Sequence, residues 1–257
     1  MNFALTNLVA YLGDFIWNLV RLGGFFMVVP IFGNQLVSTR IRIALVIAAS
    51  LTLTPVLPVG VDLMAVSLDD FVALLSQLMF AIGLGFSAAI FFQLFVIAGQ
   101  FIGMQMGLGF AAMVDPGNGV QVTVWSQFFL MLVTLSFLAI NGHLVLLEIL
   151  VKGFQLYPAG TQFTLGEFSW QLVQIGGWMF VGGLLLAIPA VVALLIVNIS
   201  FGIMNRSAPQ LNVFALGFPF SLLFGLIVIW LLLYGFSDQF LRLVEEFFRL
   251  VQQLQVR

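Results

Sequence analysis

The chain alternates between long apolar runs and short stretches that contain proline, glycine and polar residues. Six runs can be distinguished, at residues 8–30, 43–57, 71–106, 124–150, 172–204 and 213–236. About 20 consecutive apolar residues are enough for a helix to cross the hydrocarbon core of a bilayer. The pattern predicts an all-α integral membrane protein of about six long, uneven apolar helices arranged as hairpins.

The part of the chain from Ser237 onward has a different pattern. Its apolar residues recur at helical spacing, at Phe240, Val244, Phe247, Val251 and Leu254. Charged residues occupy the opposite face, at Arg242, Glu245, Glu246 and Arg249. An apolar stripe opposite a charged face predicts a C-terminal amphipathic helix.

The lengths of the runs are uneven. As a helix, residues 43–57 would reach about 22 Å and residues 71–106 about 54 Å, against a hydrocarbon core of about 30 Å. Two interpretations remain open. Either glycines break the long run, or neighbouring subunits rather than lipid surround many of these helices.

Composition supports a location in the membrane. Of the 257 residues, 62% are hydrophobic and 7% are charged, whereas a soluble domain carries roughly 25% charged residues. The net charge is −2 and no basic tract occurs, so we expect no binding of nucleic acid. The first residues lack a basic segment followed by a cleavage site, and we therefore expect no removable signal peptide.

Candidate chemistry is scarce. The chain has no cysteine and a single histidine, which leaves no thiolate ligand or nucleophile. It also lacks a nucleophile–base pair and a phosphate-binding loop. We predict no enzymatic activity, no catalytic or metal-binding residues and no cofactor.

Three polar residues share one face of the first run. Asp14, Asn18 and Arg21 stand at positions i, i+4 and i+7. Charged groups in hydrocarbon normally face a partner or a cavity. This pattern indicates a polar seam that faces another subunit or a channel. The alternative is that Asp14 lies at the membrane edge and Arg21 extends its charged end to the interface.

Glycines recur at four-residue spacing near the end of the third run, at Gly99, Gly103 and Gly107. Small residues at this spacing let helix backbones approach closely. We interpret Gly99 and Gly103 as helix-packing positions. The alternative is that the glycines let the helix bend or unwind beside a pore.

The stretch from Gly107 to Gly119 is rich in glycine and is flanked by Met104, Met106 and Met113. Methionine is deformable and can seal an irregular gap, although it often only fills a core. Asp115-Pro116-Gly117 is a strong turn signal. We expect a loop here, either an ordinary surface loop or one whose residues close a passage: Met106, Gly107, Phe110, Met113, Asp115, Pro116 and Gly117.

Asn141-Gly142-His143 interrupts the fourth run. We interpret Asn141 and His143 as intramembrane polar residues, with His143 hydrogen-bonded to a neighbouring helix. Glu148 and Lys152 stand at i, i+4 in the favourable orientation and should form an ion pair.

Three stretches of the chain resemble the FliR family, called SctT in virulence secretion systems. They are residues 21–42, including Pro30-Ile31-Phe32-Gly33; residues 98–143, including Gln105-Met106-Gly107 and Val114-Asp115-Pro116; and residues 189–213, including Asn205-Arg206-Ser207. One departure is Gln77, where the family pattern has glutamate.

The resemblance implies a core subunit of the flagellar type III protein export gate in the bacterial inner membrane, at the flagellar basal body. Its partners would be FliP-like and FliQ-like subunits, FlhB, FlhA and membrane lipid, and unfolded flagellar proteins would pass through the gate. Residues 1–170 would be FliP-like and contain the loop, which would act as a plug. Residues 171–257 would be a FliQ-like hairpin with the amphipathic tail.

Two other functions remain open. One is the equivalent gate subunit of a virulence system (SctT), although the matches around His143 and Asn212 favour the flagellar one. The other is a small-solute or ion transporter, in which Asn198 with Pro189, or Asn141 with His143, would form a site in a broken helix. Solute flux through the chain alone would favour the transporter.

Overall fold

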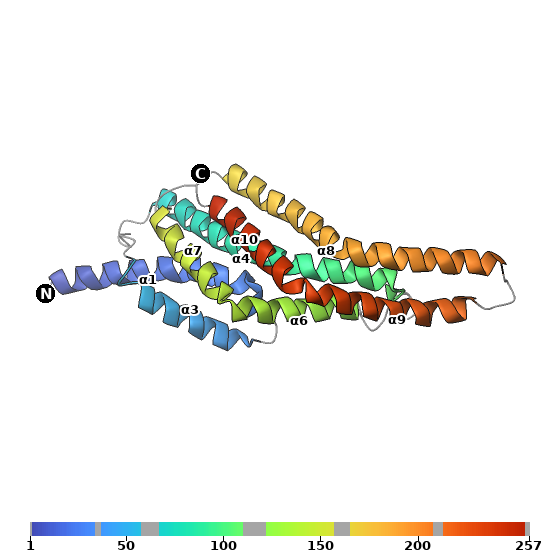
Figure 1. Cartoon of the computed structure of the whole chain (residues 1–257). Coiled ribbons are helices and arrows are strands. Elements are labelled where there is room, and N and C mark those ends of the chain that lie inside the picture. Colours follow the sequence, from blue (N-terminus) through green and yellow to red (C-terminus); the bar gives the residue numbers. More distant parts are fainter. Residues whose placement is uncertain are drawn as a thin grey trace. The chain divides into compact units, whose positions relative to one another are not determined.

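A computed structural model describes residues 2–33, 37–57, 67–109, 122–156, 165–207 and 213–254. Every regular element in these ranges is a helix (Figure 1). The helices are α1 (Asn2–Val28), α2 (Pro30–Gly33), α3 (Thr39–Leu53), α4 (Leu68–Gln105), α6 (Val124–Ala139), α7 (Gly142–Leu156), α8 (Leu165–Ser207), α9 (Val213–Tyr234) and α10 (Phe236–Gln253). The all-α prediction is confirmed.

Three of the described helices are long and apolar enough to cross a membrane: α4, α8 and α9. Helices α6 and α7 would add a fourth span if they cross as one interrupted element. Helix α3 is not among them because its 15 residues reach only about 22 Å. Helix α1 is long enough, but Asp14, Asn18 and Arg21 lower its hydropathy.

Helix α4 is continuous over 38 residues and α8 over 43 residues, which corresponds to about 57 and 64 Å. The interpretation that glycines break the long third run is therefore wrong. The helix continues through Gly83, Gly85 and Gly99 because each lies against another part of the chain, where a side chain would collide. Both helices exceed the thickness of the hydrocarbon core.

The fourth run does break. Asn141 has φ 58°, a left-handed conformation that asparagine adopts more readily than most residues. Its amide donates to the carbonyl of Leu138 (3.0 Å) and its carbonyl accepts from Leu144 (2.9 Å). Gly142 follows, and a Cβ there would lie 2.6 Å from the ring of Phe137. The interruption predicted at Asn141 is confirmed.

The helices form two compact units. The first comprises residues 1–90, 137–176 and 249–257, and the second residues 91–136 and 177–248. In the first unit α1 packs against α3. Helix α1 also approaches α4, where a Cβ on Gly85 would lie 3.0 Å from the carbonyl oxygen of Phe25.

Aromatic side chains dominate the core of the second unit. Phe247 of α10 stacks on Phe91 of α4, with ring centroids 4.8 Å apart, and Phe240 contacts both Phe91 and Phe95. The whole apolar stripe of α10 is buried, and its charged residues Arg242, Glu245, Glu246 and Arg249 are exposed. The predicted amphipathic tail helix is confirmed.

We expect Phe247→Ala to lower the stability of the chain by about 3–5 kcal/mol, because it removes a fully buried ring from this aromatic core. Leu241→Ala, on the exposed side of the same helix, should change it by less than about 0.5 kcal/mol. Thermal unfolding of the two detergent-solubilised variants measures the difference. Equal melting temperatures would mean that α10 does not pack on α4.

Candidate functional site: the base of the loop after helix α4

Helix α4 ends in a tight, hydrogen-bonded turn. Gly107 has φ 85°, and its amide donates to the carbonyl of Met104, while the amide of Leu108 donates to the carbonyl of Gly103 (both 3.0 Å). This is the Schellman arrangement, in which a left-handed glycine terminates a helix and satisfies its last carbonyls. Gly107, predicted as a loop residue, is thus where the helix stops.

Met106 is anchored in the second unit. Its side chain is 2% exposed and packs on Gly225 of α9, where a Cβ would lie 2.5 Å from the Met106 Cε atom. Met104, two residues earlier, is exposed. Of the residues expected to close a passage, only Met106 and Gly107 are described. The others lie outside the described residues: Phe110, Met113, Asp115, Pro116 and Gly117.

The chain returns to α4 directly after these undescribed residues. A Cβ on Gly99 would lie 2.6 Å from the backbone nitrogen and Cα of Ser126, and a Cβ on Gly103 would lie 2.6 Å from Oγ1 of Thr123. Real Cβ atoms do not approach other atoms so closely, so only glycine lets the first turn of α6 lie this near to α4. The structure thus brings both predicted packing glycines against the same short segment.

Hydrogen bonds join the same two segments. The backbone amide of Thr123 donates to Oε1 of Gln100 (2.9 Å), and its hydroxyl donates to the carbonyl of Gly99 (3.1 Å). The hydroxyl of Ser126 donates to the carbonyl of Val96 (2.9 Å). Thr123 and Ser126 are both buried. We call this set, Gly99, Gln100, Gly103, Thr123 and Ser126, the loop-base clasp.

Thr123 also caps α6, because the backbone amide of Ser126 donates to its Oγ1 atom (3.3 Å). A threonine directly before an apolar run is an N-cap signal that the sequence offered. Sequence reasoning missed Gln100, Thr123 and Ser126, since only the fold shows that they meet. The clasp joins α4 to the start of α6, the two described segments on either side of residues 110–121.

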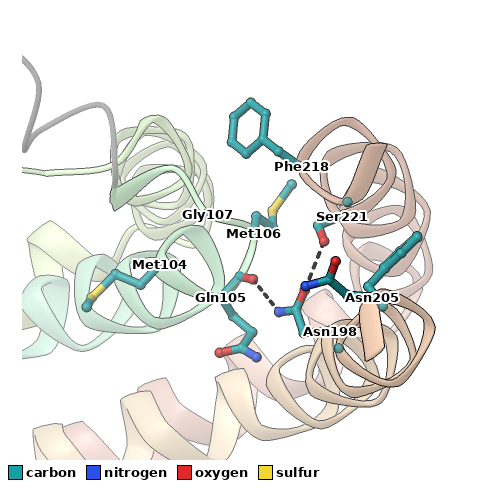
Figure 2. A pocket seen from close by; sticks show the side chains of 11 residues that line it. Met104, Gln105, Met106, Gly107, Asn198, Asn205, Phe218 and Ser221 are labelled. Atoms are coloured by element: carbon teal, nitrogen blue, oxygen red, sulfur yellow. Dashed lines mark hydrogen bonds between the residues drawn. The ribbon is translucent and has the colours of Figure 1, made fainter. Parts of the chain in front are cut away.

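A cavity of about 390 Å³ lies beside the end of α4, between α8 and α9. Its lining mixes apolar and polar residues: Met104, Gln105, Met106, Gly107, Asn198, Phe201, Gly202, Asn205, Gly217, Phe218 and Ser221. Figure 2 shows Met106 directed toward Phe218, whereas Met104 points away from Asn198.

Asn198 is held in place by both neighbouring helices (Figure 2). Its Nδ2 atom donates to the carbonyl of Gln105 (3.2 Å), and its Oδ1 atom accepts from the hydroxyl of Ser221 (3.0 Å). The carbonyl of Gln105 belongs to the last turn of α4, where intrahelical donors run out. Asn198, considered above as part of a transport site, therefore ties α8 to α4 and α9.

The polar seam of α1 lies within the first unit. The guanidinium of Arg21 donates to Oε1 of Gln77 and lies 4.7 Å from the ring centroid of Phe80 and 4.2 Å from that of Phe154. A Cβ on Gly153 would lie 2.5 Å from its Nη2 atom. Arg21 is only 1% exposed, so its charged end does not extend to the surface of the chain.

Asn18, one turn before Arg21, is fully buried. Its Nδ2 atom donates to Oγ1 of Thr54 (3.3 Å) and to the carbonyl of Leu57 (3.4 Å). Asp14 is partly exposed. The partners found for Asn18 and Arg21 belong to the same chain. Neither interpretation of the seam, as a face toward another subunit or channel or as residues at the membrane edge, included partners within the chain.

The remaining polar candidates lie in α7 and at its start. Glu148 and Lys152 form the predicted ion pair, at 2.7 Å on an exposed face. Nδ1 of His143 is buried without a hydrogen-bond partner among the described residues, so the expected bond to a neighbouring helix is not seen at this atom. No group of three His, Asp or Glu side chains suitable for a metal ion occurs in the described ranges.

Long apolar helices with few charges define an α-helical membrane protein. The model of the bacterial export proteins, family 1, matches residues 12–247. Flagellar biosynthetic protein FliR of Pectobacterium carotovorum subsp. carotovorum is 33% identical, covering 88% of this chain and 87% of the relative. FliR of Escherichia coli (strain K12) is 34% identical, covering 85% and 83%, and FliR of Bacillus subtilis (strain 168) is 29% identical, covering 82% of each. The chain belongs to this family of bacterial export proteins, the FliR family, as the resemblance indicated.

Gly99→Ala should destabilise the chain by about 1–3 kcal/mol, the usual result of forcing extra volume into a packed contact. Here the obstacle is the backbone of Ser126, which cannot rotate away. The same substitution at Gly177, an exposed helix position with no atom within 4 Å of the new Cβ, should stabilise by up to about 1 kcal/mol. Thermal unfolding in detergent should thus move in opposite directions, and parallel shifts would contradict the close approach.

Arg21→Leu should destabilise the first unit by about 1–3 kcal/mol, because it leaves the buried amide of Gln77 without this partner. Combining Arg21→Leu with Gln77→Leu should cost less than the sum of the two single changes. Arg40→Leu, at an exposed position, is the control for loss of an arginine. Strict additivity in unfolding experiments would show that Arg21 and Gln77 do not interact.

Proposed function

We propose that the chain is a core subunit of the flagellar type III protein export gate, which assembles with FliP-like and FliQ-like subunits into a channel for unfolded flagellar proteins. The similarity to FliR proteins over more than four-fifths of the chain carries this proposal. These relatives are named flagellar biosynthetic proteins, which favours the flagellar system over the virulence one. We propose a place in the bacterial inner membrane at the basal body, with FlhB and FlhA as further partners, and no catalytic role or cofactor.

The exposed apolar surface supports assembly with other subunits. The apolar 18-residue stretches of α8 and α9 are only 28% and 17% buried by the chain itself. In addition, α4 and α8 are longer than the hydrocarbon core is thick. Lipid can cover only the part of such helices that lies within the bilayer. Exposed apolar surface that lies outside the bilayer must be covered by protein partners. Our proposed division assigns residues 1–170 to a FliP-like part and 171–257 to a FliQ-like part.

Expression of the chain alone should therefore give scattered oligomeric states. Coexpression with FliP-like and FliQ-like subunits should give one monodisperse complex in size-exclusion chromatography. A well-behaved monomer that never binds these partners would contradict the proposed assembly.

We further propose that the loop after α4 closes the channel of the resting gate. In this proposal Phe110 and Met113 supply apolar bulk, and Asp115-Pro116-Gly117 forms the turn that presents it. The loop-base clasp supports the proposal, because it joins the described residues before and after the segment to each other. A closing element with a fixed base can be displaced by a passing polypeptide without separating α4 from α6.

Deletion of residues 111–114 should leave the yield of intact complex close to normal, since the clasp is untouched. It should raise leakage of small ions or dyes across the membrane, and Phe110→Ala should do the same more weakly. Dye release from vesicles that contain the complex measures the leak, with Phe101→Ala on exposed α4 surface as the control. Failure to assemble, or a membrane as tight as wild type, would remove the plug assignment.

A further inference from the structure

A second cavity, of about 310 Å³, lies in the second unit between α8 and α10. We call it the α8–α10 groove. Its lining combines apolar residues from both helices with three polar residues of α10: Trp178, Val181, Gly182, Leu185, Leu186, Leu243, Gln239, Arg242 and Glu246. It does not include any residue of the loop-base clasp.

Helix α8 passes close to the backbone of α4 beside the groove. A Cβ on Gly183, next to the groove residue Gly182, would lie 2.9 Å from the backbone carbonyl oxygen of Leu94 in α4, so α8 can lie this near to α4 only at a glycine. On either side of Gly182, Val181 and Leu185 are exposed. The α8–α10 groove thus has an apolar side along α8 that no other part of the described chain covers.

The polar side of the groove carries one positive and one negative group. Arg242 and Glu246 are one helical turn apart on α10, and both are exposed. The order Arg before Glu is the less favourable one for an i, i+4 pair, and no ion pair between them occurs in the part of the chain that the structure describes. Nε of Arg242 donates to the carbonyl of Asp238 (3.2 Å).

The α10 side of the groove lies within a few helical turns of the end of α9. Helix α9 has 22 residues, or about 33 Å, which matches the hydrocarbon thickness. Its last turn exposes Trp230 and Tyr234, the residue types that gather at membrane interfaces. Gly235 follows, and α10 begins with its charged face exposed. If α9 crosses the bilayer over this length, Arg242 and Glu246 are within a few helical turns of the headgroup layer.

We propose that the α8–α10 groove binds one phospholipid with an ethanolamine headgroup. The phosphate pairs with Arg242, the primary ammonium pairs with Glu246, and the beginning of an acyl chain lies along Val181 and Leu185. Trp178 offers an amphipathic ring beside the headgroup, as aromatic residues do at this level.

Charge complementarity selects this headgroup. A phosphate and an ammonium a few bonds apart match a cation and an anion that are one turn apart on a helix, where Cβ atoms are about 5–6 Å from each other. A choline headgroup has no N–H to donate to the Glu246 carboxylate. A glycerol headgroup adds no positive charge and leaves the carboxylate facing a phosphate.

The test uses the full chain, purified with its membrane partners in mild detergent and then placed in nanodiscs that contain ethanolamine, choline and glycerol phospholipids in equal amounts. Lipids that remain after re-extraction are measured by mass spectrometry. We expect enrichment of the ethanolamine lipid. Arg242→Gln and Glu246→Gln should each reduce it roughly tenfold or more, the effect of losing one charge-assisted hydrogen bond.

Glu245→Gln and Arg249→Gln are matched controls, because both residues are exposed on α10 and neither lines the groove. They should retain the enrichment. Equal retention of the three lipids, equal loss in controls and groove variants, or dependence on Arg242 alone would overturn the proposal. So would a photoreactive side chain at Leu185 that labels a protein rather than a lipid, since a partner helix would then occupy the groove.

Discussion

The close approach of α6 to α4 at Gly99 and Gly103 is the contact on which the arrangement of the second unit depends. Two missing side chains let the backbone of Ser126 and the side chain of Thr123 reach α4. That proximity brings the hydroxyl groups within hydrogen-bonding distance of the carbonyls of Val96 and Gly99. Larger residues at these glycines would separate the segments, and the polar groups would then be buried without partners.

The same contact explains how the proposed gate could open without coming apart. Gly107 terminates α4, Met106 fixes that end against α9, and Thr123 caps the start of α6. The end of α4 and the start of α6, which flank the connecting segment, are thus each held by contacts with described residues. In the proposed gate, closure of the channel depends on residues of the loop, whereas assembly of the complex depends on residues at the base of the loop. The two properties should therefore respond to different substitutions.

Elsewhere the chain uses its few polar groups to join helices. Arg21 links α1 to α4 and lies against α7, and Asn198 links α8 to α4 and α9. In an apolar environment such groups are tolerated when partners satisfy them. Helices that are fixed in this way internally can leave their apolar outer surfaces to lipid and to other subunits.

Local patterns in the sequence predicted the local features of the structure. The six apolar runs, the break at Asn141, the amphipathic stripe of α10 and the Glu148–Lys152 pair all depend on residues within a few turns of each other. The partners of Arg21 and Thr123 could not be predicted, because Gln77 is 56 positions from Arg21 and Gln100 is 23 positions from Thr123. Periodicity within one helix does not show which neighbouring helix it meets.

The glycines illustrate the same limit. Their spacing indicated close packing, but it could not exclude that the long run breaks, since a glycine weakens an isolated helix whatever lies beside it. Only the surroundings of Gly83, Gly85 and Gly99 show that each is a contact. The roles of Phe110, Met113 and Asp115 remain predictions from sequence, because these residues lie outside the described part of the chain.

In the proposed gate, the base of the loop stays closed during export. Because the chain contains no cysteine, Met104→Cys and Val122→Cys can be introduced together and joined by a short bifunctional thiol reagent in membranes or in living cells. Both residues are exposed and stand next to Gly103 and Thr123, which contact each other, so the clasp itself stays intact. We predict efficient cross-linking in the assembled complex, with export of flagellar proteins continuing after the link has formed. Absence of the cross-link, or export that stops once it forms, would contradict it.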